Sequence, residues 1–243
     1  MTLLILSGTG EGRRIAAELH SQGIDLIASL AGETRNPKDQ IVPLRIGGFG
    51  GEEGFRRYLA EAKISAVLDV THPFASDISE RSARICADLM LPYCIFARPP
   101  WTPNAQDDWT ELEDESAAAQ YISAGATVFL ATGRKTLHRF ADLSKCRLIC
   151  RQIDPPDGPF PFANGEFLIG RPPFSVEDEI ALFDKLKVDW LIVKNAGGAA
   201  SFSKLEAARA LKLKVGMIKR PERPDAPSVS SIEQAVEWGK SFG

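Results

Sequence analysis

Three glycines crowd the segment that follows the first apolar run of the chain. Residues 3–6 are all aliphatic, and they lead into Ser7-Gly8-Thr9-Gly10-Glu11-Gly12-Arg13. Glycines at such a turn would let the backbone approach a phosphate, and a following helix would offer free N–H groups and a positive dipole end. Arg13 stands where the strict G-x-G-x-x-G pattern has its third glycine. The segment predicts nucleotide binding through Gly8, Thr9, Gly10 and Glu11, or else a tight turn without a ligand.

The next apolar run ends at Ser29, and an acid and a cation follow it at Glu33 and Arg35. An acidic residue at this strand end suits the ribose of NAD, whereas a small hydroxyl with a cation suits the 2′-phosphate of NADP. Ser29 and Arg35 therefore favour NADPH over NADH, and Glu33 argues against that preference. The alternative is that Arg35 is only a solvated loop cation.

A histidine follows the buried run at residues 66–70, in the segment Thr71-His72-Pro73-Phe74. An imidazole in that loop could face a substrate and exchange a proton near neutral pH. Pro73 would stiffen the loop, and Phe74 could wall a ring. These features predict cofactor contacts at Thr71, Pro73 and Phe74, with His72 as a candidate catalytic group. The alternative is a histidine that only caps the following helix.

Two more apolar runs in the second half end in polar side chains. Thr132, Gly133 and Arg134 could present donors to a phosphate or a carboxylate, with the guanidinium as a fork. Of these, Gly133 is expected to contact the cofactor. Lys194 could neutralise an acid or donate a proton, and Asn195 could bind an amide. Structural capping also explains each motif taken alone.

Alternating strands and helices must position these segments. We predict strands at residues 3–6, 26–29, 41–46, 66–70, 93–97, 127–131, 147–152, 190–194 and 215–218. Helices are predicted at residues 11–21, 52–62, 76–90, 116–122, 135–142, 176–185, 202–211 and 232–240, and a loop at residues 155–170. Such alternation is typical of α/β folds with doubly wound parallel sheets, which bind ligands at the carboxyl ends of their strands.

A polar segment at residues 102–108 is the best linker candidate. We therefore predict two Rossmann-like domains, an N-terminal dinucleotide-binding domain at residues 1–105 and a second domain at residues 106–243, with a ligand cleft between them.

Composition narrows the class of protein. The chain has 243 residues, a formal net charge of −3, and 25% charged residues. This charge gives no general attraction to nucleic acid or to an anionic membrane. No apolar stretch reaches about 18 residues, so no membrane span is expected. The start of the chain lacks the basic region of a signal peptide, and the four cysteines are expected to be reduced thiols in the cytoplasm, without a metal site.

Together these motifs resemble the precorrin-6A reductase family. The resemblance keeps the motif order along nearly the whole chain, at residues 6–13, 29–32, 47–51, 69–75, 98–101, 131–134, 194–198, 204–205 and 220–221. The sequence departs from the family at Glu33, where members often have arginine. That difference bears on the cofactor preference.

The resemblance implies a cytoplasmic oxidoreductase of cobalamin biosynthesis, with two Rossmann-like domains. It would use NADPH to reduce one double bond of the precorrin-6A macrocycle, giving precorrin-6B. Its tetrapyrrole substrate carries many acetate and propionate arms, and the residues expected to hold substrate are Arg98, Arg134, Asn195 and Arg220. His72 and Lys194 are the first candidates for a proton donor, although water or a substrate carboxyl could serve. A monomer is favoured.

Three alternatives differ in chemistry. The first is the anaerobic counterpart, which would reduce the cobalt-loaded intermediate with NADPH or NADH. The second is a nucleotide-sensing module that binds NADPH without catalysis. The third is a short-chain reductase, but no Tyr-x-x-x-Lys motif occurs, because Tyr58, Tyr93 and Tyr121 are followed four residues later by Ala62, Ala97 and Gly125.

Overall fold

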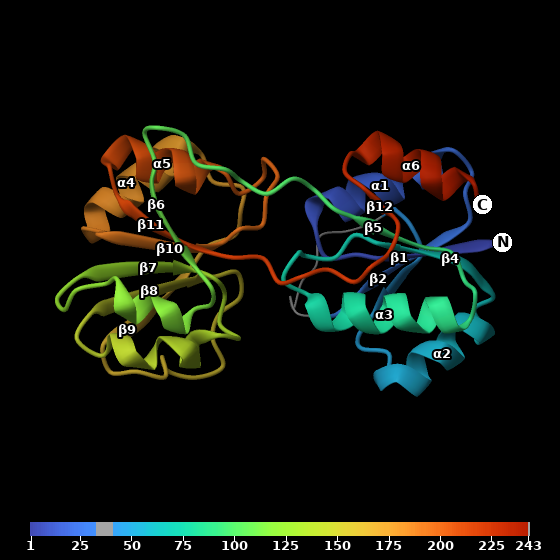
Figure 1. Ribbon diagram of the computed structural model, residues 1–243, viewed down its shortest axis with the longest axis horizontal. Coiled ribbons are helices and arrows are strands. Elements are labelled where there is room, and N and C mark those ends of the chain that lie inside the picture. Colours follow the sequence, from blue (N-terminus) through green and yellow to red (C-terminus); the bar gives the residue numbers. More distant parts are fainter. Residues whose placement is uncertain (33–40, 243) are drawn as a thin grey trace. The chain divides into compact units, whose positions relative to one another are not determined.

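The computed structural model describes residues 1–32 and 41–242. The chain forms two compact units (Figure 1). Unit 1 comprises Met1–Pro99 and Pro221–Gly243, and unit 2 comprises Pro100–Arg220. This division differs from the predicted one. The predicted first domain ends at residue 105, and the predicted second domain contains all later residues. The final segment belongs to unit 1 because its last strand pairs with a strand of that unit.

Unit 1 contains one six-stranded sheet in the order β12-β5-β4-β1-β2-β3. All its neighbouring strands pair in parallel. The strands are β1 (Thr2–Leu6), β2 (Leu26–Leu30), β3 (Leu44–Ile46), β4 (Ile64–Asp69), β5 (Tyr93–Phe96) and β12 (Ser228–Val229). The order reverses between β1 and β4, and this switch point is where doubly wound sheets bind ligands.

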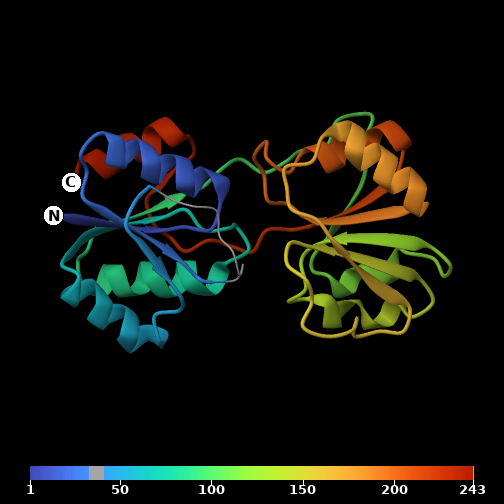
Figure 2. The same cartoon turned by 180° about the vertical axis from the view of Figure 1, so that it is seen from behind.

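Four helices cover the two faces of this sheet (Figures 1 and 2). They are α1 (Gly10–Ser21), α2 (Gly51–Glu61), α3 (Ser76–Asp88) and α6 (Ile232–Lys240). Side chains of a strand alternate between faces, so Leu3 and Ile5 pack towards α1 and α6. Leu4 and Leu6 pack towards α2 and α3. The continuous apolar run of β1 is therefore buried on both sides, as expected for a central parallel strand.

Unit 2 contains a second parallel six-stranded sheet, in the order β6-β11-β10-β7-β8-β9. Its strands are β6 (Asp108–Leu112), β7 (Thr127–Ala131), β8 (Arg147–Gln152), β9 (Gly165–Ile169), β10 (Trp190–Lys194) and β11 (Lys214–Ile218). Helices α4 (Val176–Leu186) and α5 (Ser203–Leu211) pack against one face, around Phe129, Phe183 and Leu191. The prediction of an α/β fold with two Rossmann-like halves is confirmed.

Several predicted elements of unit 2 differ in the structure. The predicted helices at residues 116–122 and 135–142 are short 3-10 helices, η1 (Ser116–Gln120) and η2 (Leu137–Leu143). The predicted loop at residues 155–170 contains β9, and the predicted linker ends where β6 begins. β6 pairs with β11, about a hundred residues later in the chain, so no local pattern indicates the pairing.

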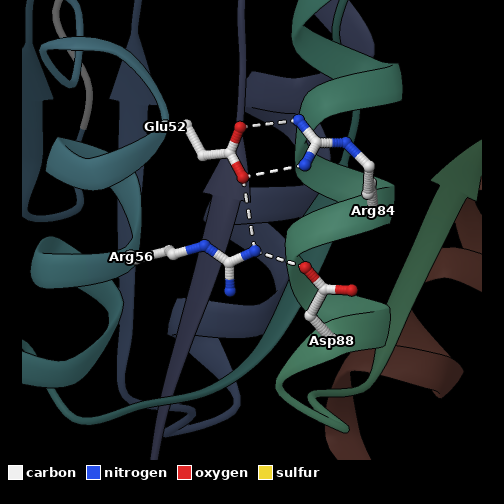
Figure 3. Close-up of polar contacts among 4 residues, drawn as sticks. All are labelled: Glu52, Arg56, Arg84 and Asp88. Atoms are coloured by element: carbon white, nitrogen blue, oxygen red, sulfur yellow. Dashed lines mark hydrogen bonds and ion pairs between the residues drawn. The ribbon is translucent and has the colours of Figure 1, made fainter.

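Two exposed ion pairs join α2 to α3 in unit 1 (Figure 3). The Arg84 guanidinium donates to both oxygens of Glu52, at 2.8 Å and 2.7 Å. Arg56 contacts Glu52 at 3.3 Å and also Asp88. The hydrogen bonding from Arg84 has the largest effect on the pKa of Glu52, and burial opposes it. The hydrogen bond from Arg56 and the charges of both arginines add to the lowering, so the pKa of Glu52 is about 2.

In the described part of the chain, no helix combines the length and apolarity needed to cross a membrane. The four cysteines are buried free thiols. Burial raises the pKa of Cys86, and likewise that of Cys150, to about 12, so both sulfurs are protonated at neutral pH. Among residues 1–32 and 41–242, no group of three or more His, Cys, Asp or Glu side chains could hold a metal ion.

Candidate active site

The predicted phosphate-binding segment lies between the carboxyl end of β1 and the start of α1. Thr9 is the N-cap of α1, and its Oγ1 accepts a hydrogen bond from the Gly12 amide at 3.1 Å. The same hydroxyl donates to the Val70 carbonyl at 2.9 Å, just beyond β4. One side chain thus orients the helix and joins the two strand ends at the switch point.

Gly12 allows α1 to begin close to the end of β1. A Cβ atom at Gly12 would lie 2.5 Å from Ser7 Oγ, so any side chain there requires movement. Gly12 therefore has the helix-packing role that the third glycine has in the usual fingerprint, one position earlier. At Gly8, by contrast, no described heavy atom outside Gly8 and its two chain neighbours lies within 4 Å of the Cβ position. Ser7 Oγ is buried and has no hydrogen-bond partner among the described residues.

Glu11, in the first turn of α1, forms an ion pair with Arg98. The Arg98 guanidinium lies 2.7 Å from Glu11 Oε2, and both side chains are largely buried. Two residues predicted for separate ligands are thus in direct contact in unit 1. The arginine charge offsets a carboxylate that would otherwise repel a phosphate at the helix start.

A buried carboxylate, Asp69, fixes the loop that carries His72. Asp69 ends β4 and accepts hydrogen bonds from the Thr71 amide at 2.9 Å, Ser79 Oγ at 2.6 Å and the Tyr93 hydroxyl at 2.8 Å. Burial raises the pKa of Tyr93, and the charge of Asp69 raises it further, so the phenol stays a donor. We did not predict a site role for Asp69, whose only signal is an acid at the end of a buried strand.

His72 is exposed on this loop, and its Nδ1 accepts a hydrogen bond from the Phe74 amide at 3.2 Å. The two rings lie 5.7 Å apart. Thr71 contributes its hydroxyl to the same loop, 3.4 Å from Ser79 Oγ. The bond to Nδ1 leaves Nε2 as the nitrogen that carries the proton of a neutral ring. Proton donation by His72 stays a prediction.

An arginine that we did not predict lies beside Ser29. Arg45, in β3, contacts Ser29 Oγ at 3.5 Å and donates to the carbonyls of Gly47 and Gly48. Its guanidinium lies 3.9 Å from the centre of the Phe49 ring. Arg45 lies beside Ser29 because β2 and β3 pair in parallel, which brings the ends of both strands together. The predicted residues Glu33 and Arg35 lie outside the described residues.

In unit 2, the segment after β7 combines a buried hydroxyl with an exposed cation. Thr132 is buried, and its Oγ1 has no partner among the described residues. Gly133 has a φ of 78°, which favours glycine. Arg134 is half exposed and lies 3.4 Å from Asp157. The turn therefore directs a cation to solvent at the carboxyl edge of the sheet.

Lys194, predicted as a catalytic residue, forms an ion pair with Glu115. Its ammonium lies 3.2 Å from Oε1 of that buried carboxylate. Arg139 contacts the other oxygen at 3.4 Å. Burial opposes ionisation of Glu115, but hydrogen bonds and the charge of Lys194 outweigh it, so the pKa of Glu115 is lowered. If Lys194 gave up its proton, the Glu115 carboxylate would lose the positive charge of its ion-pair partner.

Asn195 and Arg220 form hydrogen bonds just after the carboxyl ends of β10 and β11 in unit 2. The Asn195 side chain accepts from the Trp101 amide at 2.8 Å and donates to the Trp101 carbonyl at 3.0 Å. Arg220 Nε donates to the Asn195 carbonyl at 2.6 Å. These contacts give both residues a structural role, and substrate binding by either stays a prediction.

The structure brings the predicted residues together in two groups, one in each unit. In unit 1, the segments around Gly8, Ser29 and His72 meet at the carboxyl edge of the sheet, and Arg98 joins them through Glu11. In unit 2, the segments around Thr132 and Lys194 meet at the corresponding edge. Their assignment to cofactor, substrate or catalysis stays a prediction.

Comparisons with known proteins agree with one another. The family model described as "Precorrin-6x reductase CbiJ/CobK" matches residues 2–240. The precorrin-6A reductase of Rhodobacter capsulatus is 40% identical over 242 residues, which are 99% of this chain and 96% of the relative. A cobalt-precorrin-6A reductase of Priestia megaterium is 27% identical over 249 residues, covering 96% of each.

A solved structure, "CobK precorrin-6A reductase", has a TM-score of 0.95 at 39% sequence identity, and the match covers 100% of this chain and 97% of that one. Sequence and fold therefore match over the full length of both units. The chain belongs to the precorrin-6x reductase CbiJ/CobK family.

Proposed function

We propose that this protein reduces one double bond of the precorrin-6A macrocycle to give precorrin-6B, a step of cobalamin biosynthesis. The observation that carries the proposal is the full-length match to a relative named precorrin-6A reductase, at 40% identity. Identity to the relative named for the cobalt-loaded substrate is lower, at 27%. This difference favours the metal-free substrate over its anaerobic counterpart.

The carboxyl edge of the unit 1 sheet suits a nicotinamide dinucleotide. The open backbone at Gly8 and the capped start of α1 provide room and N–H donors for a diphosphate. The buried hydroxyl of Ser7 is an additional donor that no described residue satisfies. When bound, the nicotinamide supplies the hydride, and the protein binds, orients and shields the reacting groups.

We propose NADPH in preference to NADH. Arg45 holds a guanidinium beside Ser29 at the end of β2, where dinucleotide folds place the adenosine ribose. Methionine at Arg45 would keep much of the packing on Phe49 while removing the charge. We expect R45M and R35A each to raise the KM for NADPH far more than the KM for NADH. Equal losses with both nucleotides would remove the residue concerned from a 2′-phosphate site.

The tetrapyrrole is proposed to lie against cations at the strand ends. Arg98, Arg134 and Arg220 are the candidates for its carboxylate arms, and guanidinium groups suit such planar anions. His72 is the first proton donor to test, because the hydrogen bond that Nδ1 accepts from the Phe74 amide places the proton of a neutral ring on Nε2. If H72A showed the turnover and Michaelis constants of the wild type, His72 would have no part in the reaction.

The proposal is tested by mixing the protein with precorrin-6A and NADPH and following the absorbance of both chromophores. We expect the tetrapyrrole spectrum to change as NADPH is oxidised, with one NADPH oxidised for each tetrapyrrole reduced. The same mixture with cobalt-precorrin-6A distinguishes the anaerobic activity. A protein that binds NADPH but leaves both spectra unchanged would be a nucleotide-sensing module instead. We further propose a cytoplasmic monomer, and light scattering would check the oligomeric state.

A further inference from the structure

Asp69 joins four parts of unit 1 through one side chain. It ends β4 and is 1% exposed. Its Oδ1 accepts a hydrogen bond from the Thr71 amide, and its Oδ2 accepts from Ser79 Oγ in α3 and from the Tyr93 hydroxyl in β5. We call Asp69 and these three donors the Asp69 network. Because the carboxylate is covered and bonded on both oxygens, it acts on its neighbours and does not itself contact a ligand.

The Asp69 network fixes both ends of the loop at residues 71–75. At the start of the loop, the Thr71 amide is bonded to Asp69, and Thr71 Oγ1 lies 3.4 Å from Ser79 Oγ. At its end, Ala75 is the N-cap of α3 and supplies no side-chain cap. Ser79 lies one turn further, where its amide donates to the Ala75 carbonyl at 3.3 Å while its hydroxyl donates to Asp69. The network therefore sets the position of the loop relative to β4.

The surroundings of Asp69 make these hydrogen bonds strong. Burial raises the pKa of the Tyr93 phenol, and the charge of Asp69 raises it further, so this donor keeps its proton at neutral pH. Hydrogen bonds to a charged group are stronger than those between neutral groups. Buried networks whose members are all bonded hold their parts in one arrangement. The loop is thus attached to a rigid part of unit 1.

The place of β4 in the sheet relates this loop to one half of a dinucleotide. β1 lies between β2 and β4, and the strand order reverses there. Dinucleotides bind across the crevice at such a switch point, with one nucleotide half on each side. In the proposed function the adenosine half lies at the end of β2, beside Arg45. The nicotinamide half then lies at the end of β4, where the loop at residues 71–75 begins.

We propose that Asp69 is a positioning residue for the nicotinamide half of NADPH. It acts through the loop at residues 71–75, which it holds together with Thr71 and the start of α3. A loop that is ordered before the nucleotide arrives adds no ordering cost to binding. The inference rests on the proposed function, since it takes NADPH as the nucleotide and unit 1 as its site.

Titration calorimetry with two nucleotides tests this role. Adenosine 2′,5′-bisphosphate carries the adenosine half of NADPH without the nicotinamide. We expect D69A to weaken NADPH binding about tenfold or more, because the loop then becomes ordered only on binding. The affinity for the bisphosphate should stay unchanged, whereas a general destabilisation of unit 1 would weaken both ligands. The matched control D77A removes an exposed carboxylate from the first turn of α3 and should change neither affinity.

Two further variants separate the hydrogen bonds of Asp69 from its bulk and charge. In D69N, the amide oxygen still accepts from Thr71, and the amide N–H groups can donate to the hydroxyls of Ser79 and Tyr93. D69N should therefore bind NADPH within about threefold of the wild type. Y93F keeps the ring and removes one donor, so it should weaken NADPH roughly threefold. If the Tm of D69A shows that it does not fold, Y93F and D69N decide the result.

These titrations contain no tetrapyrrole, so the role of Asp69 is decided whether or not precorrin-6A is reduced. A wild type that binds NADPH without reducing precorrin-6A would refute the proposed reaction and leave the positioning role intact. Equal weakening of both nucleotides in D69A or Y93F would overturn the inference. So would unchanged NADPH affinity in these two variants, or D69N binding as weakly as D69A.

Discussion

The contact between Gly12 and Ser7 predicts a strong coupling between two small residues. A methyl group at Gly12 would lie 2.5 Å from Ser7 Oγ but 3.4 Å from Ser7 Cβ. Only the hydroxyl is therefore in the way of Gly12→Ala. Overpacking of this kind costs about 1–3 kcal/mol. Alanine gains about 1 kcal/mol over glycine within a helix, so Gly12→Ala should destabilise unit 1 by up to about 2 kcal/mol.

Ser7→Ala removes the obstructing oxygen and leaves the backbone unchanged. Since that hydroxyl is buried without a described partner, its removal alone should have little effect on stability or increase it slightly. In the Ser7→Ala background, Gly12→Ala should then become neutral or stabilising. The coupling energy of the double-mutant cycle should be about 1–3 kcal/mol, well above the value for independent sites.

Hydrogen exchange of peptides from β1 and β4 is the appropriate assay, because it reports on unit 1 without assuming that both units unfold together. NADPH affinity is a second readout, which should stay weakened in the double variant if the Ser7 hydroxyl binds the nucleotide. Additive effects within about 0.5 kcal/mol would refute the close approach of helix and strand on which the reasoning rests.

Three further predictions follow from single contacts. Thr9→Val should cost about 1–2 kcal/mol and weaken NADPH binding, because it removes both the cap of α1 and the bond to Val70, whereas Thr9→Ser should keep both; urea unfolding checks this. The pKa of Glu52 is about 2 in the folded chain and 4.5 ordinarily, so its stabilisation is complete above pH 4.5 and is lost as the pH falls through 2. Glu52→Gln should flatten that acid dependence of the urea midpoint, and Glu53→Gln should not. Glu179→Gln should destabilise unit 2 by about 3–5 kcal/mol, since Arg151 stays buried without its anion, and a Glu179→Leu and Arg151→Met double variant should recover most of the Tm.

Much of the fold could be predicted because local pattern determines it. Continuous apolar runs such as β1, followed by glycine turns and amphipathic helices, are typical of parallel α/β sheets. The two short helices η1 and η2 were expected to be α-helices, since their composition favours helix. Segments of five and seven residues gain too little from helix formation to be governed by propensity alone.

The local sequence pattern could not predict which strands pair across long stretches of the chain. β6 belongs with β11, and β12 belongs with β5, across more than a hundred residues of sequence in each case. The domain boundaries depend on these two pairings. Strand β12 has only two residues, so nothing in its composition separates it from a loop.

Segments of the candidate site that directly follow buried strands could be located from the sequence, whereas residues whose contacts depend on the folded chain could not. The functional roles of both stay predictions. The turn at Gly8–Gly10 and the loop at His72 could be located because each directly follows a buried strand. Asp69 and Arg45 could not, since their roles come from partners that only the folded chain brings near. Asn195 and Lys194 show the converse, because their side chains are engaged in contacts that the sequence does not reveal.

The two units differ in one feature that bears on which of them holds the dinucleotide. Each places a buried hydroxyl without a described partner directly after its first central strand, Ser7 after β1 and Thr132 after β7. In unit 1 a twelve-residue α-helix with a threonine cap follows, and its aligned peptide dipoles favour an anion at that end. In unit 2 the 3-10 helix η2 follows, without a side-chain cap. Because a short 3-10 turn offers a weaker dipole and fewer aligned N–H groups, this difference supports the proposal that the diphosphate binds to unit 1 rather than to the corresponding edge of unit 2.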